Sequence, residues 1–248
     1  MHAPCEQTLE HQILTQWRTA LRQPGFCFVS DQLMRTVLSA TALRAWPSFA
    51  QSWNDLVLDA YMRDAGRYRK RRHAAFNVAA NGVITALPAQ PHYQSVDYNP
   101  LNGGIARHFA PILPANSSNP LFLELLQRFV ELVQPLRADV KGWLAEAHQF
   151  RIEPTPDAAG LPTPEGVHRD GVDYVLVLMV ARENIAAGTT TVHLADGLEV
   201  GSFTLSQPLE AVWLDDRRIF HGVTAVHARD PELPAYRDVL VLTLRRLE

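Results

Sequence analysis

The chain has 248 residues, 47% of them hydrophobic, and its 23 Lys and Arg against 26 Asp and Glu give a formal net charge of -3. This length fits a single domain, residues 1–248, with a sizeable core. The charge supplies no positive field for nucleic acid or anionic lipid. We therefore expect a small-molecule partner, with no nucleic acid and no membrane, and we leave the oligomeric state open.

The sequence also gives an expectation for the cellular compartment. The opening "MHAPCEQTLEHQ" has no basic start followed by an apolar run, and the apolar run "YVLVLMVA" is far shorter than a membrane span. Cys5 and Cys27 are too few for a disulfide framework, which suits a reducing compartment. We expect a cytoplasmic protein.

The first part of the chain is expected to be mainly helical. Apolar residues from Glu6 to about Leu21 follow the three-to-four spacing of an amphipathic helix. The stretch "GFCFVS" then predicts a strand, and Ser30 and Asp31 form a polar opening that predicts the start of a second helix. A third helix is expected from Phe49 to about Asp64.

The middle of the chain combines a loop-rich region with one long helix. Turn signals such as "NG" and "NGG" predict loops and short extended pieces over 67–114. The basic cluster "RYRKRR" within it is either a solvated surface or a source of one or two arginines, such as Arg69, that grip a carboxylate. A helix should follow from Pro120, and Pro135 should kink or split it.

From Gln149 onward the pattern changes to about seven short strands without helices between them. This succession points to a double-stranded β-helix, or jelly roll, with the helices packed outside. The predicted fold class is mainly β with flanking helices, in which a helical part, about 1–147, precedes the main jelly-roll strands, about 148–248.

The candidate site centres on "HRDGVDYVLVLMV", where His168 and Asp170 precede a strand. A protein-kinase catalytic loop also reads His-Arg-Asp, but it requires an Asn where this chain has Val175, and it requires a Gly-rich loop upstream. A strand edge with two polar residues on one side is the simpler alternative. His221 precedes another strand, and two imidazoles with one carboxylate match the facial triad of non-haem iron(II) oxygenases. Residues two apart on an extended chain point to the same side.

Arg237 stands at the entry to the last strand, 16 residues after His221. A guanidinium that faces the interior there could hold a dicarboxylate in a two-pronged grip. The alternative is an edge-strand Arg paired to Asp238.

Several separated segments carry a resemblance to a known family. "YNPLNGGIARHFAPI", "PEGVHRDGVDYV", "DDRRIFHGVTAV" and "YRDVLVLTLRR" recur in order and resemble the bacterial 2-oxoglutarate- and iron(II)-dependent dioxygenases related to isoleucine hydroxylase. The similarity extends from about Pro24 to Leu247. It implies that His168, Asp170 and His221 bind iron and that Arg237 binds the distal carboxylate of 2-oxoglutarate.

The resemblance further implies hydroxylation or sulfoxidation of a small substrate, a free aliphatic L-amino acid, with Fe(II), 2-oxoglutarate and O2 required and ascorbate as a stimulant. Candidate substrate-binding residues are Glu165, Tyr98, Asn102 and Arg69. Asp215 and Asp216 are expected to make the turn before Arg217, and the alternative is that one of them orients a ligand His. Two other functions remain open: a metal- or metabolite-binding jelly-roll protein or sensor without turnover, and a zinc hydrolase, because zinc also accepts two His and one carboxylate.

Overall fold

The computed structural model describes residues 4–62 and 68–247 of the chain. The helices are α1 (Pro4–Arg22), α2 (Asp31–Val37), α3 (Ala40–Gln51), α4 (Pro114–Ser117) and α5 (Pro120–Val133), with 3-10 turns at Ser52–Asp55 and Gln134–Leu136. The strands of the first 152 residues are β1 (Phe26–Val29), β2 (Val57–Leu58), β3 (Arg69–Ala79), β4 (Ile84–Ala86) and β5 (Gly142–Ile152). The remaining strands are β6 (Tyr174–Glu183), β7 (Ile185–Ala187), β8 (Thr190–His193), β9 (Glu199–Phe203), β10 (Ala211–Asp215), β11 (Phe220–Val223), β12 (Val226–Ala228) and β13 (Tyr236–Arg246).

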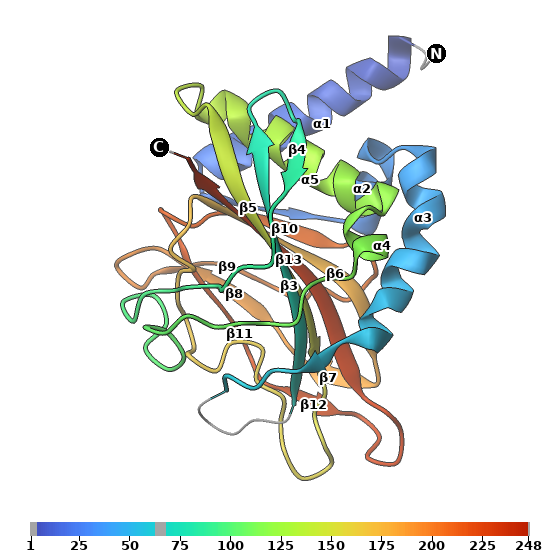
Figure 1. Cartoon of the computed structure of the whole chain (residues 1–248), viewed down its shortest axis with the longest axis vertical. Helices are drawn as coiled ribbons and strands as arrows, with labels where there is room; N and C mark the ends of the chain where they lie inside the picture. Colours follow the sequence, from blue (N-terminus) through green and yellow to red (C-terminus); the bar gives the residue numbers. More distant parts are fainter. Residues whose placement is uncertain (1–3, 63–67, 248) are drawn as a thin grey trace.

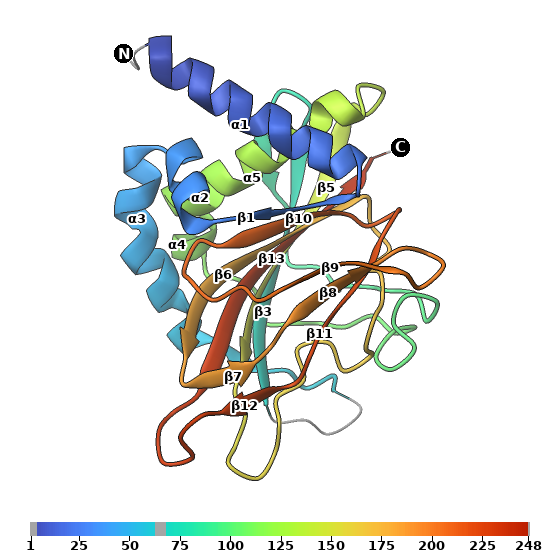
Figure 2. The same cartoon turned by 180° about the vertical axis from the view of Figure 1, so that it is seen from behind.

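These elements form three layers, with one large sheet in the middle. The large sheet has eight antiparallel strands in the order β1-β10-β6-β13-β5-β3-β2, with β4 paired to β3. Helices α1, α2, α3 and α5 lie over one of its faces (Figure 1). The three-stranded sheet β11-β8-β9 and the pair β12-β7 lie over the other face (Figure 2). Mainly β structure with helices outside a jelly-roll core was predicted, and this is what the chain adopts.

The alternation of side chains along the central strands gives each face of the large sheet its own core. In β10, Trp213 points to the helical layer, where it packs 5.1 Å from Phe129 between ring centroids. Val212 and Leu214 point the other way and join Val192 of β8 in the core between the two sheets. The central part of the large sheet is therefore buried on both sides, which explains why β6 and β10 read as nearly continuous apolar runs.

The structure corrects two of the expected helices. The apolar spacing from Leu33 to Ala42 predicts one continuous second helix, but this helix is interrupted, because the Ser39 hydroxyl accepts a hydrogen bond from the Ala42 amide (3.1 Å) and starts α3 as a separate helix. The helix expected from Phe49 to about Asp64 is wrong over 52–62, and residues 63 and 64 lie outside the described residues. Helix α3 ends at Gln51, after which the Trp53 indole nitrogen donates to the Phe150 carbonyl (3.0 Å) and the chain turns towards β2. The break at Pro135 was predicted: α5 ends two residues before it.

The region expected to be loop-rich contains β3, an 11-residue strand in the middle of the site. Strand β5 also starts at Gly142 and not near Gln149. Both strands belong to the large sheet, so the sheet draws on both sides of the boundary expected at 147/148. Within the basic cluster, Arg69 and Arg71 are buried, whereas Arg67 lies outside the described residues.

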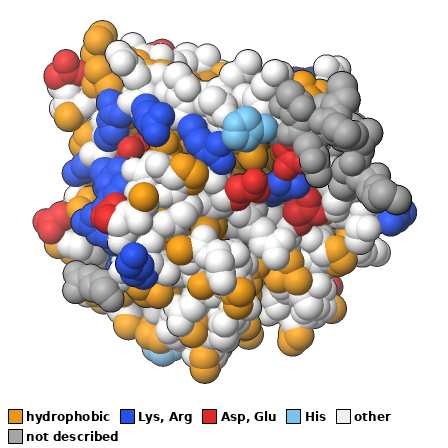
Figure 3. All heavy atoms as spheres, turned by 90° about the horizontal axis from the view of Figure 1, so that it is seen from above, with side chains coloured by type: hydrophobic (Ala, Val, Ile, Leu, Met, Phe, Trp, Pro, Cys, Tyr) orange, Lys and Arg blue, Asp and Glu red, His pale blue; other side chains and the backbone are white. Residues whose placement is uncertain are grey.

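None of the helices that the structure describes combines the length and apolar character needed to cross a bilayer. The end of the molecule that carries the N-terminal helix shows basic and acidic side chains intermixed with apolar ones (Figure 3).

Candidate active site

The structure brings His168, Asp170 and His221 together between the two sheets. His168 and His221 form an isolated antiparallel bridge in which each amide donates to the other's carbonyl at 2.9 Å. The pairing sets the two imidazoles side by side with ring centroids 4.7 Å apart. The Asp170 carboxylate lies 3.7 Å from Nε2 of each ring through different oxygens. Three potential ligand atoms thus converge within 4.8 Å of one another.

The surroundings of the triad fix its orientation. Nδ1 of His168 donates to the Gly166 carbonyl (3.0 Å), which directs Nε2 towards Asp170. Asp216 accepts the amides of three consecutive residues, Asp170, Gly171 and Val172, at 2.9, 2.8 and 3.1 Å. Asp216 therefore holds the backbone of the Asp170 segment, and its carboxylate contacts amides of that segment and not a ring nitrogen of His168 or His221 in the described residues.

The electrostatics of the triad suit a cation. Burial acts to lower the pKa of His168, but the hydrogen bond and charge of Asp170 outweigh it and raise that pKa to about 9. Burial acts to raise the pKa of Asp170, but His168 and His221 bring it down to about 2. Burial and the charge of His168 lower the pKa of His221 to about 4, and its buried Nδ1 has no hydrogen-bond partner among the described residues. Two imidazole nitrogens and one carboxylate with an open side form a donor set that fits iron(II).

Strands β3, β5 and β13 form one wall of the pocket beside the triad. Four rows of cross-strand partners share this face: Arg69, Ile152 and Arg237; Arg71, Phe150 and Val239; His73, His148 and Val241; and Ala75, Glu146 and Thr243. Most of these residues line the same pocket as the triad. The wall therefore changes from guanidinium groups at one end, through imidazoles, to a carboxylate at the other.

Arg237 lies in this wall with 2% of its surface exposed. The neighbouring carboxylate of Asp238 is held elsewhere, by two hydrogen bonds of 2.7 Å from Arg151. Burial and the nearby charge of Arg182 lower the pKa of Arg237 to about 10, and its buried Nε has no partner among the described residues. The alternative of an Arg paired to Asp238 is thus not what the structure has.

The arginines at the other side of the wall differ in the contacts that their guanidinium groups make with the protein. Arg69 donates to Asp59 through Nε (2.8 Å) and Nη2 (2.7 Å). Arg71 lies 3.6 Å from Asp59, and its guanidinium is 3.5 Å from the centre of the Phe109 ring. Arg107, which lies outside the strands, donates at 3.3 Å to the side-chain oxygen of Gln94. Of these three arginines, Arg107 is the one without a carboxylate at ion-pair distance among the described residues.

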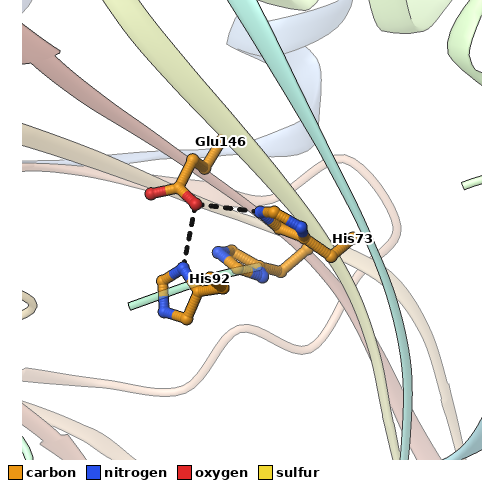
Figure 4. Close-up of side chains that lie close together, drawn as sticks. His73, His92 and Glu146 are labelled. Atoms are coloured by element: carbon orange, nitrogen blue, oxygen red, sulfur yellow. Dashed lines mark hydrogen bonds and ion pairs between the residues drawn. The ribbon is translucent and has the colours of Figure 1, made fainter. Parts of the chain in front are cut away.

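Three histidines converge on Glu146 at the far end of the wall. His73 Nε2 and His92 Nδ1 both lie 2.9 Å from the same Glu146 oxygen (Figure 4). Burial acts to raise the pKa of Glu146, but these two donors outweigh it and lower the pKa. Nδ1 of His148 accepts from Nη2 of Arg71 at 2.6 Å, because a guanidinium can only donate. Burial, together with the charge of Arg71, holds the pKa of His148 well below 6.5, so its proton resides on Nε2.

The four predicted substrate-binding residues have different positions. Glu165 lines the pocket, with Oε1 3.3 Å from His168 Nε2. Arg69 lines it too, but its guanidinium is engaged by Asp59. Tyr98 and Asn102 are not among the described residues that line this pocket, and Tyr98 packs instead over Gly171 beside the separate hollow that contains Arg169.

The sequence analysis missed Arg71, Arg107, Glu146 and the histidines around it as parts of one site. The available signal was the two-residue spacing of Glu146 and His148 in "EAHQF", which places both side chains on one face of a strand. The segment that holds Arg69, Arg71 and His73 is polar at nearly every position, so it shows no such alternation. Arg107 had no such signal, because a long loop brings it to the pocket.

Comparisons with known proteins agree with this geometry. The model of the family described as 2OG-Fe dioxygenase matches residues 50–243. The chain is 26% identical over 245 residues to 3(1)-hydroxy-L-isoleucine 4-dioxygenase of Pantoea ananatis (strain AJ13355), covering 95% of this chain and 97% of that protein. It is also 26% identical over 157 residues to L-isoleucine-4-hydroxylase of Bacillus thuringiensis, covering 61% and 64% of the two chains.

Solved structures extend the comparison. A bsmA homolog from Methylobium petroleophilum PM1 has a TM-score of 0.85 at 36% identity and covers 94% of this chain and 93% of its own. IDO from Bacillus thuringiensis shares the fold with a TM-score of 0.78 at 16% identity, over 95% of this chain and 96% of its own. The family match spans most of the sequence and includes the triad and Arg237, and the chain belongs to the 2OG-Fe dioxygenase family.

Proposed function

We propose that this protein oxidises a free aliphatic L-amino acid, by hydroxylation or sulfoxidation, with His168, Asp170 and His221 holding the iron and Arg237 holding 2-oxoglutarate. The family uses Fe(II), 2-oxoglutarate and O2. The observation that carries the proposal is that the three ligand atoms and an uncompensated buried guanidinium face one pocket. Two of the relatives are named for oxidation of isoleucine or its hydroxylated form, which supports an amino acid as substrate.

The residues of this chain would share the work as follows. Bound iron(II) with 2-oxoglutarate and O2 supplies the oxidising chemistry, while the protein supplies placement and exclusion of water. Arg237 would fix the far carboxylate of the cosubstrate by a charge-assisted pair. Val239 and Val241 follow it along the same face of β13 and give the pocket an apolar floor between Arg237 and the triad. Asp216 would keep the Asp170 loop in place through its three amide contacts.

The amino acid proposal is tested by a panel of free L-amino acids that includes isoleucine, leucine and methionine. Each is incubated with the iron-loaded protein, 2-oxoglutarate and ascorbate, and the product is identified by mass. We expect at least one aliphatic member to raise succinate formation and to gain one oxygen atom. An inert panel, together with oxidation of a peptide or a carrier-bound substrate, would contradict the free amino acid.

The same assay separates the other two functions. A zinc hydrolase would work with zinc and form no succinate, and a sensor would bind its ligand without consuming 2-oxoglutarate. Succinate formation that requires iron and is absent with zinc contradicts both. The proposal retains the cytoplasm as the location and a small molecule as the partner.

A further inference from the structure

The pocket holds charges that neither the triad nor the 2-oxoglutarate site uses. Glu165 has its side chain 9% exposed, and its buried Oε2 has no hydrogen-bond partner among the described residues. Its other oxygen, Oε1, lies 3.3 Å from Nε2 of His168. That nitrogen is the one directed towards the metal position. Once His168 binds a metal, Glu165 is a buried carboxylate that still requires a cation.

Arg107 is a buried cation that requires an anion. It is 2% exposed and lines the same pocket, and its buried Nε has no partner in the described part of the chain. Its Nη2 donates a hydrogen bond to a neutral amide, that of Gln94. Asp59, the nearby carboxylate, is already occupied by Arg69 through two short contacts. A buried guanidinium in this position requires an anion from outside the protein.

The two groups lie close enough to sense each other. The charge of Glu165 acts to raise the pKa of Arg107, although burial dominates and lowers it. No ion pair joins them directly in the described part of the chain, and both line one pocket, which leaves space between a buried anion and a buried cation. An α-amino acid carries an ammonium and a carboxylate on one carbon, so its head group offers a partner to each.

We propose that Arg107 binds the α-carboxylate and Glu165 binds the α-ammonium group of the amino acid substrate. This inference rests on the proposed function and deepens it. The other charges of this pocket already have partners or an assigned ligand: Asp59 faces Arg69 and Arg71, Asp170 lies beside His168 and His221, and Arg237 is assigned to 2-oxoglutarate. Arg107 and Glu165 remain for the two charges of a zwitterion.

The pairing also explains why a free amino acid is favoured over the same residue in a peptide or on a carrier. A peptide bond or thioester at the carboxyl end removes the anion that Arg107 requires. Acylation at the amino end removes the cation that Glu165 requires. Leaving either buried group unpaired costs more than the contact itself contributes, which is the usual basis of strong discrimination by polar groups.

The test measures binding, so that it does not depend on turnover. Wild-type protein loaded with manganese(II) and 2-oxoglutarate is titrated calorimetrically with L-isoleucine, L-isoleucinamide and N-acetyl-L-isoleucine. Arg107→Gln and Glu165→Gln are compared with Arg44→Gln and Glu199→Gln, which make the same chemical changes at exposed positions far from the pocket. Manganese and 2-oxoglutarate affinities are measured for every variant, and Arg107→Lys provides a variant that keeps the charge.

We expect wild type and both controls to bind L-isoleucine about 30-fold or more tighter than either derivative, the range for truncation of one partner of a buried charge pair. Arg107→Gln should remove the preference for the acid over the amide while keeping the preference over the N-acetyl compound. Glu165→Gln should do the reverse. A general structural defect would lower affinity for all three compounds by the same factor.

Each opposite result overturns the inference. Equal losses for all three ligands in either variant would assign that residue a structural role. Loss of manganese in Glu165→Gln would make Glu165 a metal ligand and not an ammonium partner. Failure of wild type to bind or turn over any free amino acid would remove the substrate class itself, whereas binding with unchanged preferences in the variants would remove only the two assigned roles.

Discussion

Replacing Arg237 should weaken cosubstrate binding while leaving the ligand-free protein at least as stable as before. The side chain is 2% exposed, its neighbour Asp238 is bound to Arg151, and the charge it senses most is that of Arg182, another cation. The fold lowers its pKa from 12.5 to about 10. A lowered pKa of a basic group means that the folded state disfavours its charged form. For Arg237 this penalty at neutral pH is about 3 kcal/mol, at ~1.36 kcal/mol per pKa unit.

Arg237→Met keeps much of the side-chain volume and removes the charge. It should keep or raise the stability of the ligand-free protein and lower its affinity for 2-oxoglutarate. The free energy of unfolding without 2-oxoglutarate should stay the same or rise by up to about 3 kcal/mol, the penalty of the buried charge. The dissociation constant of 2-oxoglutarate should rise about 30-fold to several-thousand-fold, equivalent to about 2–5 kcal/mol for a truncated charge pair. Arg237→Lys should recover only part of the affinity, since it keeps the charge and loses the planar fork.

Both changes are measurable on the same protein. Urea unfolding gives the ligand-free stability, and titration of 2-oxoglutarate into the iron-loaded protein under nitrogen, followed by metal-to-ligand absorption, gives the dissociation constant. Arg182→Met is the matched control, because it removes a neighbouring guanidinium that donates to the backbone carbonyl of Ile185. A change in the dissociation constant below about threefold, or a control that weakens 2-oxoglutarate equally, would refute the role given to Arg237.

Three further predictions concern the metal and the histidine network. Asp170→Ala should lose stoichiometric iron, whereas His193→Ala, at the end of β8, should keep it, as measured by metal analysis after desalting. The reverse pattern would mean that the triad is misassigned. Glu146→Gln should lower the free energy of urea unfolding by about 2 kcal/mol, because a charged acceptor of two buried imidazole N–H groups is lost; a loss under about 0.5 kcal/mol would contradict this. His148 has a folded pKa below its ordinary 6.5, so the unfolded chain takes up the proton first and stability falls as pH drops below 6.5, by at most about 1.4 kcal/mol per pH unit. His148→Asn should flatten that slope in urea titrations between pH 6.5 and 5.5, and an unchanged slope would show that other groups cause it.

The triad was predictable because its signals are local. His168 and Asp170 stand two apart shortly before the apolar strand β6, and His221, which the sequence pattern places directly before a strand, lies within the short strand β11. The long apolar strands β6 and β13 were visible for the same reason, since both of their faces are buried. The fold class followed from the succession of such strands.

Strand β3 could not be found from hydrophobic periodicity. Its inward residues are Arg69, Arg71 and His73, because the pocket that they line is polar, and its outward residues at that end include Lys70 and Arg72. A strand with charge on both faces has no apolar alternation and reads as a solvated basic cluster. Only the pairing with β5 reveals which guanidiniums are buried.

The predicted substrate residues show where local reasoning ends. Glu165 reached the pocket because it lies three residues before His168, on the same short segment. Tyr98 and Asn102 were chosen from a turn-rich stretch whose path no residue pattern determines. Arg107 comes from the same region and reaches the pocket through a bridge with His92, a pairing that depends on the folded loop.

The site is divided between two sheets that meet only through their side chains. The triad of His168, Asp170 and His221 belongs to the layer of β11, whereas Arg237 and the polar wall belong to the large sheet. The spacing between the proposed iron site and Arg237 is therefore set by apolar packing between the layers, where Val192 meets Val212, and by Leu205 against Met179. Larger or smaller side chains at these positions would change which substrate carbon lies nearest the oxidant, without a change in any polar group. Differences in this interlayer packing could therefore make relatives with the same chemistry attack different carbons.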